Sequence, residues 1–234
     1  MAGTVTHLVI ADQLLEPLQI QHPALFYCGN LAPDAIMARE GYQREMKRHT
    51  HFKDGIRLND LHLPECYDRY RRSFRAFIRN YLHPDSPDYE LYLGYVTHML
   101  ADEVFILTLR DRFVQKLTAE GLDTEDPANY AAFSRDVDLN DWQLVREYSF
   151  RYPMPDILLQ EQQYEIRDYI TCRELQDSKR FIIQKNFLTP HEQQPQTAIP
   201  FAGNQEYIQN ACRFIQKEIS SCGLPLPRFD RGPC

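Results

Sequence analysis

The sequence lacks the long apolar run that a membrane-spanning helix needs, because none of its 234 residues belong to an uninterrupted apolar stretch of about 18. It also lacks a basic leader at its start, where His7 and Asp12 break the apolar stretch early. The formal net charge is −7, so no overall basic field favours nucleic acid or an anionic membrane. We therefore expect a cytoplasmic protein with no transmembrane segment and no specific nucleic-acid partner.

Three catalytic or metal-binding signatures are missing. The six cysteines have no C-x₂₋₄-C spacing, which argues against a zinc knuckle and favours reduced thiols. No G-x-S-x-G motif is present, so a serine hydrolase of that type is not indicated. The adjacent His-Asp pair that HD-type phosphohydrolases require is absent as well.

Strand-like alternation is weak along the whole chain, whereas helical spacing of apolar residues recurs. We expect an all-α fold, a multi-helix bundle forming one domain over residues 1–222, followed by a loosely ordered tail over residues 223–234. Helical patterns cover residues 4–16, 22–28, 66–82, 87–119, 128–150, 155–185 and 204–220. Residues 40–65 and 188–203 are expected to be irregular.

The helix predicted over residues 66–82 carries both arginines and aromatic residues, which could indicate a surface for nucleic acid or a membrane. Its aromatic residues are spaced to form one core-facing stripe, with the arginines around them. Given the negative net charge, we favour the structural interpretation.

His98 and Asp102 lie four residues apart in the most helix-like stretch of the chain. This spacing places the imidazole and the carboxylate on one helical face, within an apolar stripe. A carboxylate buried there would cost several kcal/mol unless it were paired, hydrogen-bonded or bound to a cation. A metal ion is a leading candidate for that partner.

Three other residues could join such a site, and each also has a purely structural explanation. Asp34 follows Pro33 at the expected start of a helix, where it could simply be a helix cap. His51 lies in the irregular stretch, where it could belong to a solvated basic loop. His7 lies in the first helix, where a backbone carbonyl could satisfy it.

The order H…(G-N-x-x-P-D)…(H-F-x-D)…(G-Y-x-x-H-x-x-x-D) over roughly residues 1–110 resembles the zinc-dependent phospholipase C superfamily, which includes single-strand nucleases. The resemblance implies a phospholipase C/nuclease-like helical bundle. It also implies that Asp34, His51, His98 and Asp102 hold one zinc ion. A second ion would involve His7 and share Asp102.

The sequence departs from the family at the third metal ion. The histidine expected shortly after the helix pair is missing in 106–109, and no histidine occurs between His98 and His191. The acidic cluster of Asp136, Asp138 and Asp141 could supply oxygens instead. We expect one well-formed site; its two imidazoles and two carboxylates suit zinc but also iron, manganese or nickel.

These features lead to the hypothesis of a metal-dependent hydrolase, phospholipase C-like, acting on a small-molecule or lipid-derived phosphoester. Asp54 and Glu103 are candidates to orient the attacking water or take its proton, although Glu103 could also face solvent. Lys47, Arg48, Lys53 and Arg57 could counter a substrate phosphate or form a solvated loop. The alternative is a non-catalytic helical scaffold that keeps a structural metal or a hydrogen-bonded His/Asp cluster. Substrate and oligomeric state are left open.

Overall fold

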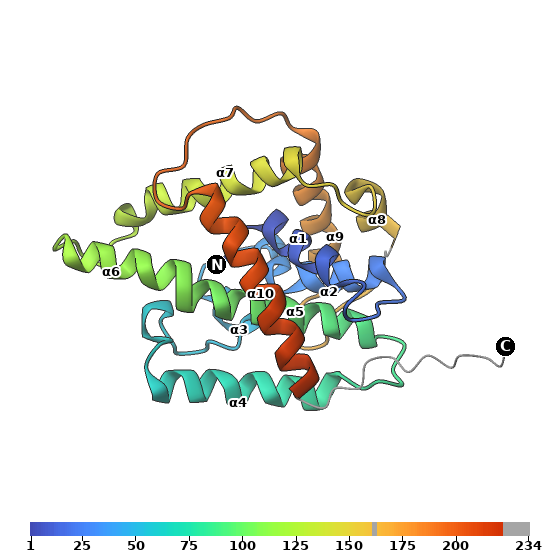
Figure 1. Cartoon of the computed structure of the whole chain (residues 1–234). Helices are drawn as coiled ribbons and strands as arrows, with labels where there is room; N and C mark the ends of the chain where they lie inside the picture. Colours follow the sequence, from blue (N-terminus) through green and yellow to red (C-terminus); the bar gives the residue numbers. More distant parts are fainter. Residues whose placement is uncertain (161–162, 222–234) are drawn as a thin grey trace.

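The computed structural model describes residues 1–160 and 163–221, and the chain folds into a bundle of helices (Figure 1). The α-helices are α1 (Thr4–Leu14), α2 (Pro23–Ala35), α3 (Met46–Thr50), α4 (Pro64–Tyr81), α5 (Tyr89–Phe105), α6 (Asp111–Ala119), α7 (Ala131–Glu147), α8 (Met154–Gln160), α9 (Cys172–Ile182) and α10 (Phe201–Ser221). Short 3₁₀ or π-helical turns lie at η1 (Ile36–Ala38), η2 (Leu58–Asp60), η3 (Ile106–Arg110), η4 (Pro127–Tyr130) and η5 (Ile183–Leu188). In the described residues the only β-type pairing is an isolated bridge between Ile166 and Ile170, which confirms the predicted all-α class.

Helix α5 forms the centre of the bundle. Every residue of this helix except Val104 is buried, and α1 and α2 are buried almost as completely. Their sequences are apolar on all sides, which is what a helix enclosed by other helices requires. In Figure 1 these three helices lie in the middle, with α10 crossing in front of them, α4 below and α7 above.

Two glycines bring α2 and α5 into close contact. A Cβ atom on Gly29 would lie 1.8 Å from the carbonyl oxygen of Leu91, and one on Gly94 would lie 2.1 Å from the carbonyl oxygen of Phe26. Only glycine lets two helix backbones approach so closely, because any side chain would occupy the space of the opposite backbone. The crossing therefore fixes α2 against α5.

This contact explains one error of the sequence analysis. The predicted helix over residues 22–28 was expected to end at Gly29, but α2 continues through Gly29 and Pro33 to Ala35. Gly29 serves the packing against Leu91 rather than a helix end. Asp34 consequently lies in the last turn of α2 and not at the start of a new helix, so it is not an N-terminal cap.

Other boundaries differ less. The helix predicted over residues 155–185 is divided into α8 and α9, with residues 163–171 non-helical, and the irregular stretch at 40–65 contains the short helix α3. Residues 87–119 are helical from Tyr89 to Ala119, with a π-helical turn at η3. The predicted tail over residues 223–234 lies outside the described residues.

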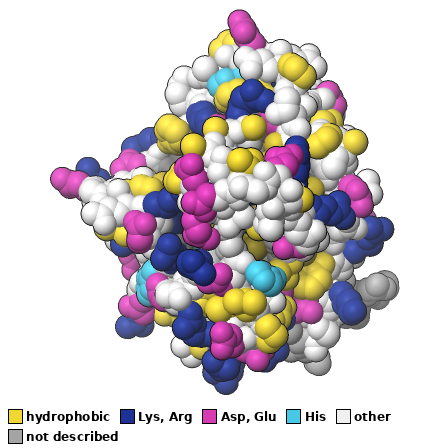
Figure 2. All heavy atoms as spheres, turned by 90° about the vertical axis from the view of Figure 1, so that its left-hand side faces the viewer, with side chains coloured by type: hydrophobic (Ala, Val, Ile, Leu, Met, Phe, Trp, Pro, Cys, Tyr) yellow, Lys and Arg dark blue, Asp and Glu magenta, His cyan; other side chains and the backbone are white. Residues whose placement is uncertain are grey.

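Helix α4 shows the expected division of its side chains. Tyr70, Phe74 and Phe77 are buried in the core, whereas Arg72 and Arg75 are exposed. Figure 2 shows Lys and Arg side chains interspersed with Asp and Glu over the face it presents. The structural interpretation of the aromatic residues is thus confirmed.

Within the described ranges, no helix combines the length and apolar character needed to cross a membrane.

We predict that Gly94→Ala lowers the free energy of unfolding by about 1–3 kcal/mol, the usual cost of overpacking a tight core. The added methyl would meet the Phe26 carbonyl and force α2 away from α5. Urea unfolding followed by circular dichroism measures the change. Gly203→Ala in α10 is the matched control, because nothing lies within 4 Å of its new Cβ; it should be neutral or slightly stabilising. Equal stabilities of the two variants would contradict the close crossing.

Candidate metal centre

Five buried side chains from four segments converge beside the α2–α5 crossing. His7 comes from α1, Asp34 from the last turn of α2, and His51 from the residue that ends α3. His98 and Asp102 come from α5, one helical turn apart on the same face. None of the five is more than 5% exposed.

These side chains form two overlapping groups, each with ligand atoms that all lie within 4.8 Å of one another. The first group is Asp34, His51 and His98, and the second is His7, His98 and Asp102. Asp102 also approaches the first group, since its Oδ2 is 3.6 Å from Nε2 of His51. The four residues expected to share one ion are therefore brought together, and His7 lies beside them.

A turn at Phe52 directs His51 inward. The amide of Lys53 donates to the carbonyl of Arg48 at 2.8 Å, and Phe52 between them has a φ of 56°, so α3 ends in a left-handed turn. Glycine is usual at such a position, and a bulky residue there costs roughly 1–2 kcal/mol. The Phe52 ring packs against Phe77 and Tyr95 of the core, which compensates for that cost. His51 and Lys53 are buried on either side of it.

Backbone carbonyls fix the protonation of two histidines. Nδ1 of His51 donates to the carbonyl of Lys47 at 2.9 Å, and Nδ1 of His98 donates to the carbonyl of Asn30 at 2.8 Å. A carbonyl oxygen only accepts, so each Nδ1 carries the hydrogen and each neutral ring presents a lone pair at Nε2. This arrangement is the usual support of a metal-binding histidine.

The lone pairs point at carboxylate oxygens rather than at donors. Nε2 of His51 lies 3.2 Å from Oδ1 of Asp34, and Nε2 of His98 lies 3.9 Å from the same oxygen. Both Nε2 atoms and Oδ2 of Asp102 are buried without a hydrogen-bond partner, and Oδ1 of Asp34 has only the ammonium of Lys47 beside it. Two acceptors facing each other repel unless a cation lies between them, so these residues fit a bound metal ion.

Other buried carboxylates receive more hydrogen bonds than those of the centre, where Asp102 accepts one from the amide of Ala2. Asp12 accepts hydrogen bonds from the hydroxyls of Tyr27 and Tyr148, and Glu90 accepts from the amides of Gln21 and His22. In the centre, the cation that meets Asp34 is the ammonium of Lys47, 2.6 Å from Oδ1.

The electrostatics keep the donor set in its metal-binding protonation state. Burial lowers the pKa of His51 to about 4, although Asp34 opposes that effect, and burial holds the pKa of His98 well below its usual value. Burial raises the pKa of Asp34, but the ammonium of Lys47 opposes that effect, and the pKa lies well below its usual value. Imidazoles and carboxylate are thus deprotonated at neutral pH.

The second group differs from the first. The His7 ring stacks on His98 at 3.8 Å between centroids, and its Nε2 lies 3.4 Å from Oδ1 of Asp102. Neither ring nitrogen of His7 has a hydrogen-bond partner, so no carbonyl orients it. Because Nδ1 of His98 is already used, only Nε2 is available to both groups. An ion held by the first group therefore leaves His7 and Asp102 as the remaining donors of the second.

The structure does not bring the two predicted catalytic carboxylates to the centre. Asp54 is 69% exposed and pairs with His49 at 2.9 Å on the surface. Glu103 is buried, contrary to the idea that it faces solvent, and its two oxygens accept hydrogen bonds from Tyr67 and Arg71.

The acidic cluster of α7 has structural partners as well. Asp141 accepts hydrogen bonds from the amides of Val5 and Thr6 at the start of α1. Asp136 accepts from the amides of the loop 197–199, and Asp138 pairs with Lys185. In the described part of the chain these carboxylates belong to neither group of potential metal ligands.

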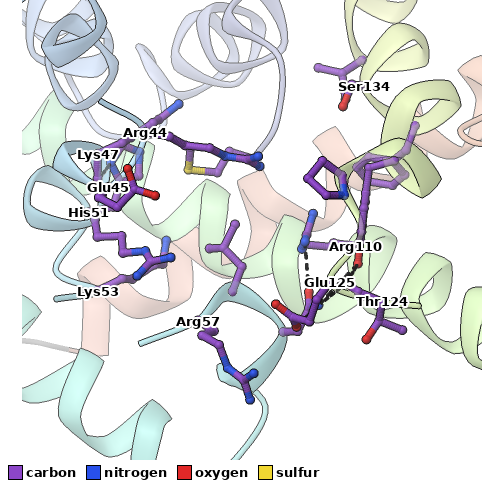
Figure 3. Close-up of a pocket in the computed structure, with 18 residues that line it drawn as sticks. Arg44, Glu45, Lys47, His51, Lys53, Arg57, Arg110, Thr124, Glu125 and Ser134 are labelled. Atoms are coloured by element: carbon purple, nitrogen blue, oxygen red, sulfur yellow. Dashed lines mark hydrogen bonds between the residues drawn. The ribbon is translucent and has the colours of Figure 1, made fainter. Parts of the chain in front are cut away.

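A pocket of about 440 Å³ adjoins the centre and shares Lys47 and His51 with it (Figure 3). Lys47, Arg48, Lys53 and Arg57, named from the sequence as possible phosphate contacts, all line it. Sequence reasoning missed Arg110 on the opposite wall. No local motif marks this residue, because only the fold brings η3 to face the residues around His51.

We predict that the metal-free protein loses stability as the pH falls from about 6.5 towards 4. The unfolded chain protonates His51 near 6.5, whereas the folded chain resists protonation until about pH 4. Protonation therefore favours the unfolded chain, by up to about 3 kcal/mol from this residue. Urea unfolding in the presence of EDTA at pH 7 and pH 5 measures the loss. A His51→Asn variant should show a shallower decline, and identical declines would contradict the assignment.

Residues 6–105 match the model of a protein family described as "Zinc dependent phospholipase C". This stretch contains all five side chains of the centre. No curated protein and no solved structure shows a significant match to the chain. The family match and the two His/Asp groups support a metal-dependent hydrolase. Over residues 6–105 the chain is similar to the zinc-dependent phospholipase C family.

Proposed function

We propose that this protein is a zinc-dependent phosphoester hydrolase whose metal is held by Asp34, His51, His98 and Asp102. The observation that carries the proposal is the set of four buried acceptor atoms that face one another, among which only Oδ1 of Asp34 has a cation beside it, the ammonium of Lys47. Two imidazoles and two carboxylates are donors that zinc accepts, and hydrolytic zinc sites keep a further position open. Zinc bound there would activate water and withdraw charge from a phosphoryl oxygen.

The residues around the centre would have different roles in this function. Asp34 and Asp102 are anionic and offset the charge of a divalent cation, while the carbonyls of Lys47 and Asn30 hold the two imidazoles in place. The ammonium of Lys47 lines the pocket and can contact a substrate phosphate beside the centre. We do not assign a base to Asp54 or Glu103, since the contacts of both lie elsewhere.

We further propose that one ion is bound tightly. The two groups of potential ligands compete for the single available Nε2 of His98, and His7 lacks the carbonyl support that orients the other two histidines. A second ion between His7 and Asp102 would have only two protein ligands from this cluster.

The alternative is a helical scaffold with a structural metal. Structural zinc sites are closed by four protein ligands with no access for substrate. The pocket reaches His51 and has the size of a small-molecule site, which favours the hydrolase.

The test combines metal content with turnover of a chromogenic phosphodiester such as bis(p-nitrophenyl) phosphate. We expect about one zinc per chain, and hydrolysis that EDTA abolishes and added zinc restores. The His98→Ala variant should lose the metal, and its activity should fall at least about 100-fold. Removing even a residue that only hydrogen-bonds to a metal ligand lowers metal affinity or activity roughly 10–100-fold. His83→Ala, at an exposed histidine outside the centre, is the control and should retain both.

Two results would decide against parts of this proposal. Zinc retained by His98→Ala would show that the metal, if any, is bound elsewhere. Stoichiometric zinc with no metal-dependent turnover of any phosphodiester would favour the scaffold.

A further inference from the structure

The pocket beside the metal centre is positively charged although the protein is not. Its lining contains two acidic side chains, Glu45 and Glu125, and six basic ones: Arg44, Lys47, Arg48, Lys53, Arg57 and Arg110. The chain as a whole has a net charge of −7. Positive charge is thus concentrated in this concave site, which is an arrangement that attracts and holds anions.

Lys53 is the most informative of these residues. Its side chain is 1% exposed, and its Nζ has no hydrogen-bond partner. The nearest described aromatic partner is the ring of Tyr70, 5.5 Å from Nζ. A buried ammonium without a partner costs several kcal/mol, and the left-handed turn at Phe52 holds it there. An anion in the pocket would supply the missing partner.

Arg110 faces this side of the pocket from the opposite wall (Figure 3). Its guanidinium lies over the Tyr130 ring, 4.6 Å from the centroid, and donates once to Asn59 at 2.9 Å. Its Nε is buried without a partner. The side chain is therefore held in place while donors of its planar fork remain to bind an oxyanion.

More positive charge is present than one phosphodiester group requires. A diester phosphate carries a single negative charge, and Lys47 already lies at the centre where that group would be hydrolysed. Lys53 and Arg110 add two further cations, neither of which is ion-paired in the described structure. A choline-like cationic group would meet repulsion here.

We propose that the pocket binds a second phosphate group of the substrate, so that the substrate is a phosphoester whose polar part carries an additional phosphomonoester. Lys53 and Arg110 contact that additional phosphate, and the apolar wall formed by Tyr130, Phe133 and Val137 covers the carbon skeleton between the two phosphates. The inference depends on the proposed function only for deciding which of the two phosphates is hydrolysed. The anion site itself rests on the two cations.

The test is calorimetric titration of the full chain, zinc-loaded and after chelation, with inorganic pyrophosphate and with phosphocholine. We expect pyrophosphate to bind at least tenfold more tightly than phosphocholine in both states. Lys53→Met and Arg110→Met should each weaken pyrophosphate binding tenfold or more, because charged hydrogen bonds are lost. Lys116 is an exposed residue of α6 outside the pocket, so the Lys116→Met variant should bind pyrophosphate as tightly as the unchanged protein.

A stability measurement distinguishes loss of the anion site from misfolding of the Lys53 variant. Lys53→Met removes a buried unpaired charge and keeps an unbranched side chain only one atom shorter, so its urea midpoint should equal or exceed that of the unchanged protein. Unaltered pyrophosphate affinity in both pocket variants would overturn the inference, as would binding that requires zinc and ignores Lys53. Binding that depends on Lys53 in a protein that hydrolyses nothing would instead uphold the anion site and refute the proposed function.

A sedimentation assay distinguishes the two sources of such a phosphate. Phosphatidylcholine vesicles containing a minority of phosphatidylinositol 4-phosphate should bind the protein through Lys53 if the phosphate belongs to a lipid headgroup. Binding of soluble pyrophosphate alone, again dependent on Lys53, would indicate a water-soluble substrate. Both results support the site and differ only in the origin of its ligand.

Discussion

The closeness of α2 to α5 determines the geometry of the metal centre. Gly29 and Gly94 let the two backbones meet at a distance that no other residue would permit. At this distance the carbonyl of Asn30 in α2 reaches Nδ1 of His98 in α5 and fixes the orientation of its ring. One turn beyond Asn30, α2 presents Asp34 to the same imidazole. The crossing therefore positions one of the proposed ligands and orients another.

The buried acceptor atoms of the centre repel one another, and a cation between them would remove that repulsion. Elsewhere in the core, carboxylates such as Asp12 and Glu90 receive hydrogen bonds from hydroxyls or amides. In the centre, Asp34, Asp102 and the imidazoles present acceptors to one another, and burial keeps the imidazole of His51 neutral by lowering its pKa to about 4. Such a cluster destabilises the metal-free fold, and the proposed metal ion would relieve that cost.

Local sequence was sufficient for the features that depend on helical periodicity. The four-residue spacing of His98 and Asp102 placed both on one face of α5, and the apolar spacing of α4 separated its buried aromatics from its exposed arginines. The lack of strand-like alternation predicted the all-α fold, and the order of the short motifs around Asp34, His51 and His98 indicated the family. The helical features are local because each depends only on neighbours within about one or two helical turns, and each motif is itself a short run of residues.

Tertiary structure decided what depends on residues distant in the chain. Gly29 looked like a helix end because its true partner, Leu91, belongs to another helix. Glu103 looked like a candidate catalytic group, but its carboxylate is held by Tyr67 and Arg71 of α4. Arg110 carried no signal until the fold placed η3 opposite the metal centre. The sequence alone determined which side chains could form the centre; only packing between helices decided which of them meet, because burial and pairing are properties of the assembled core.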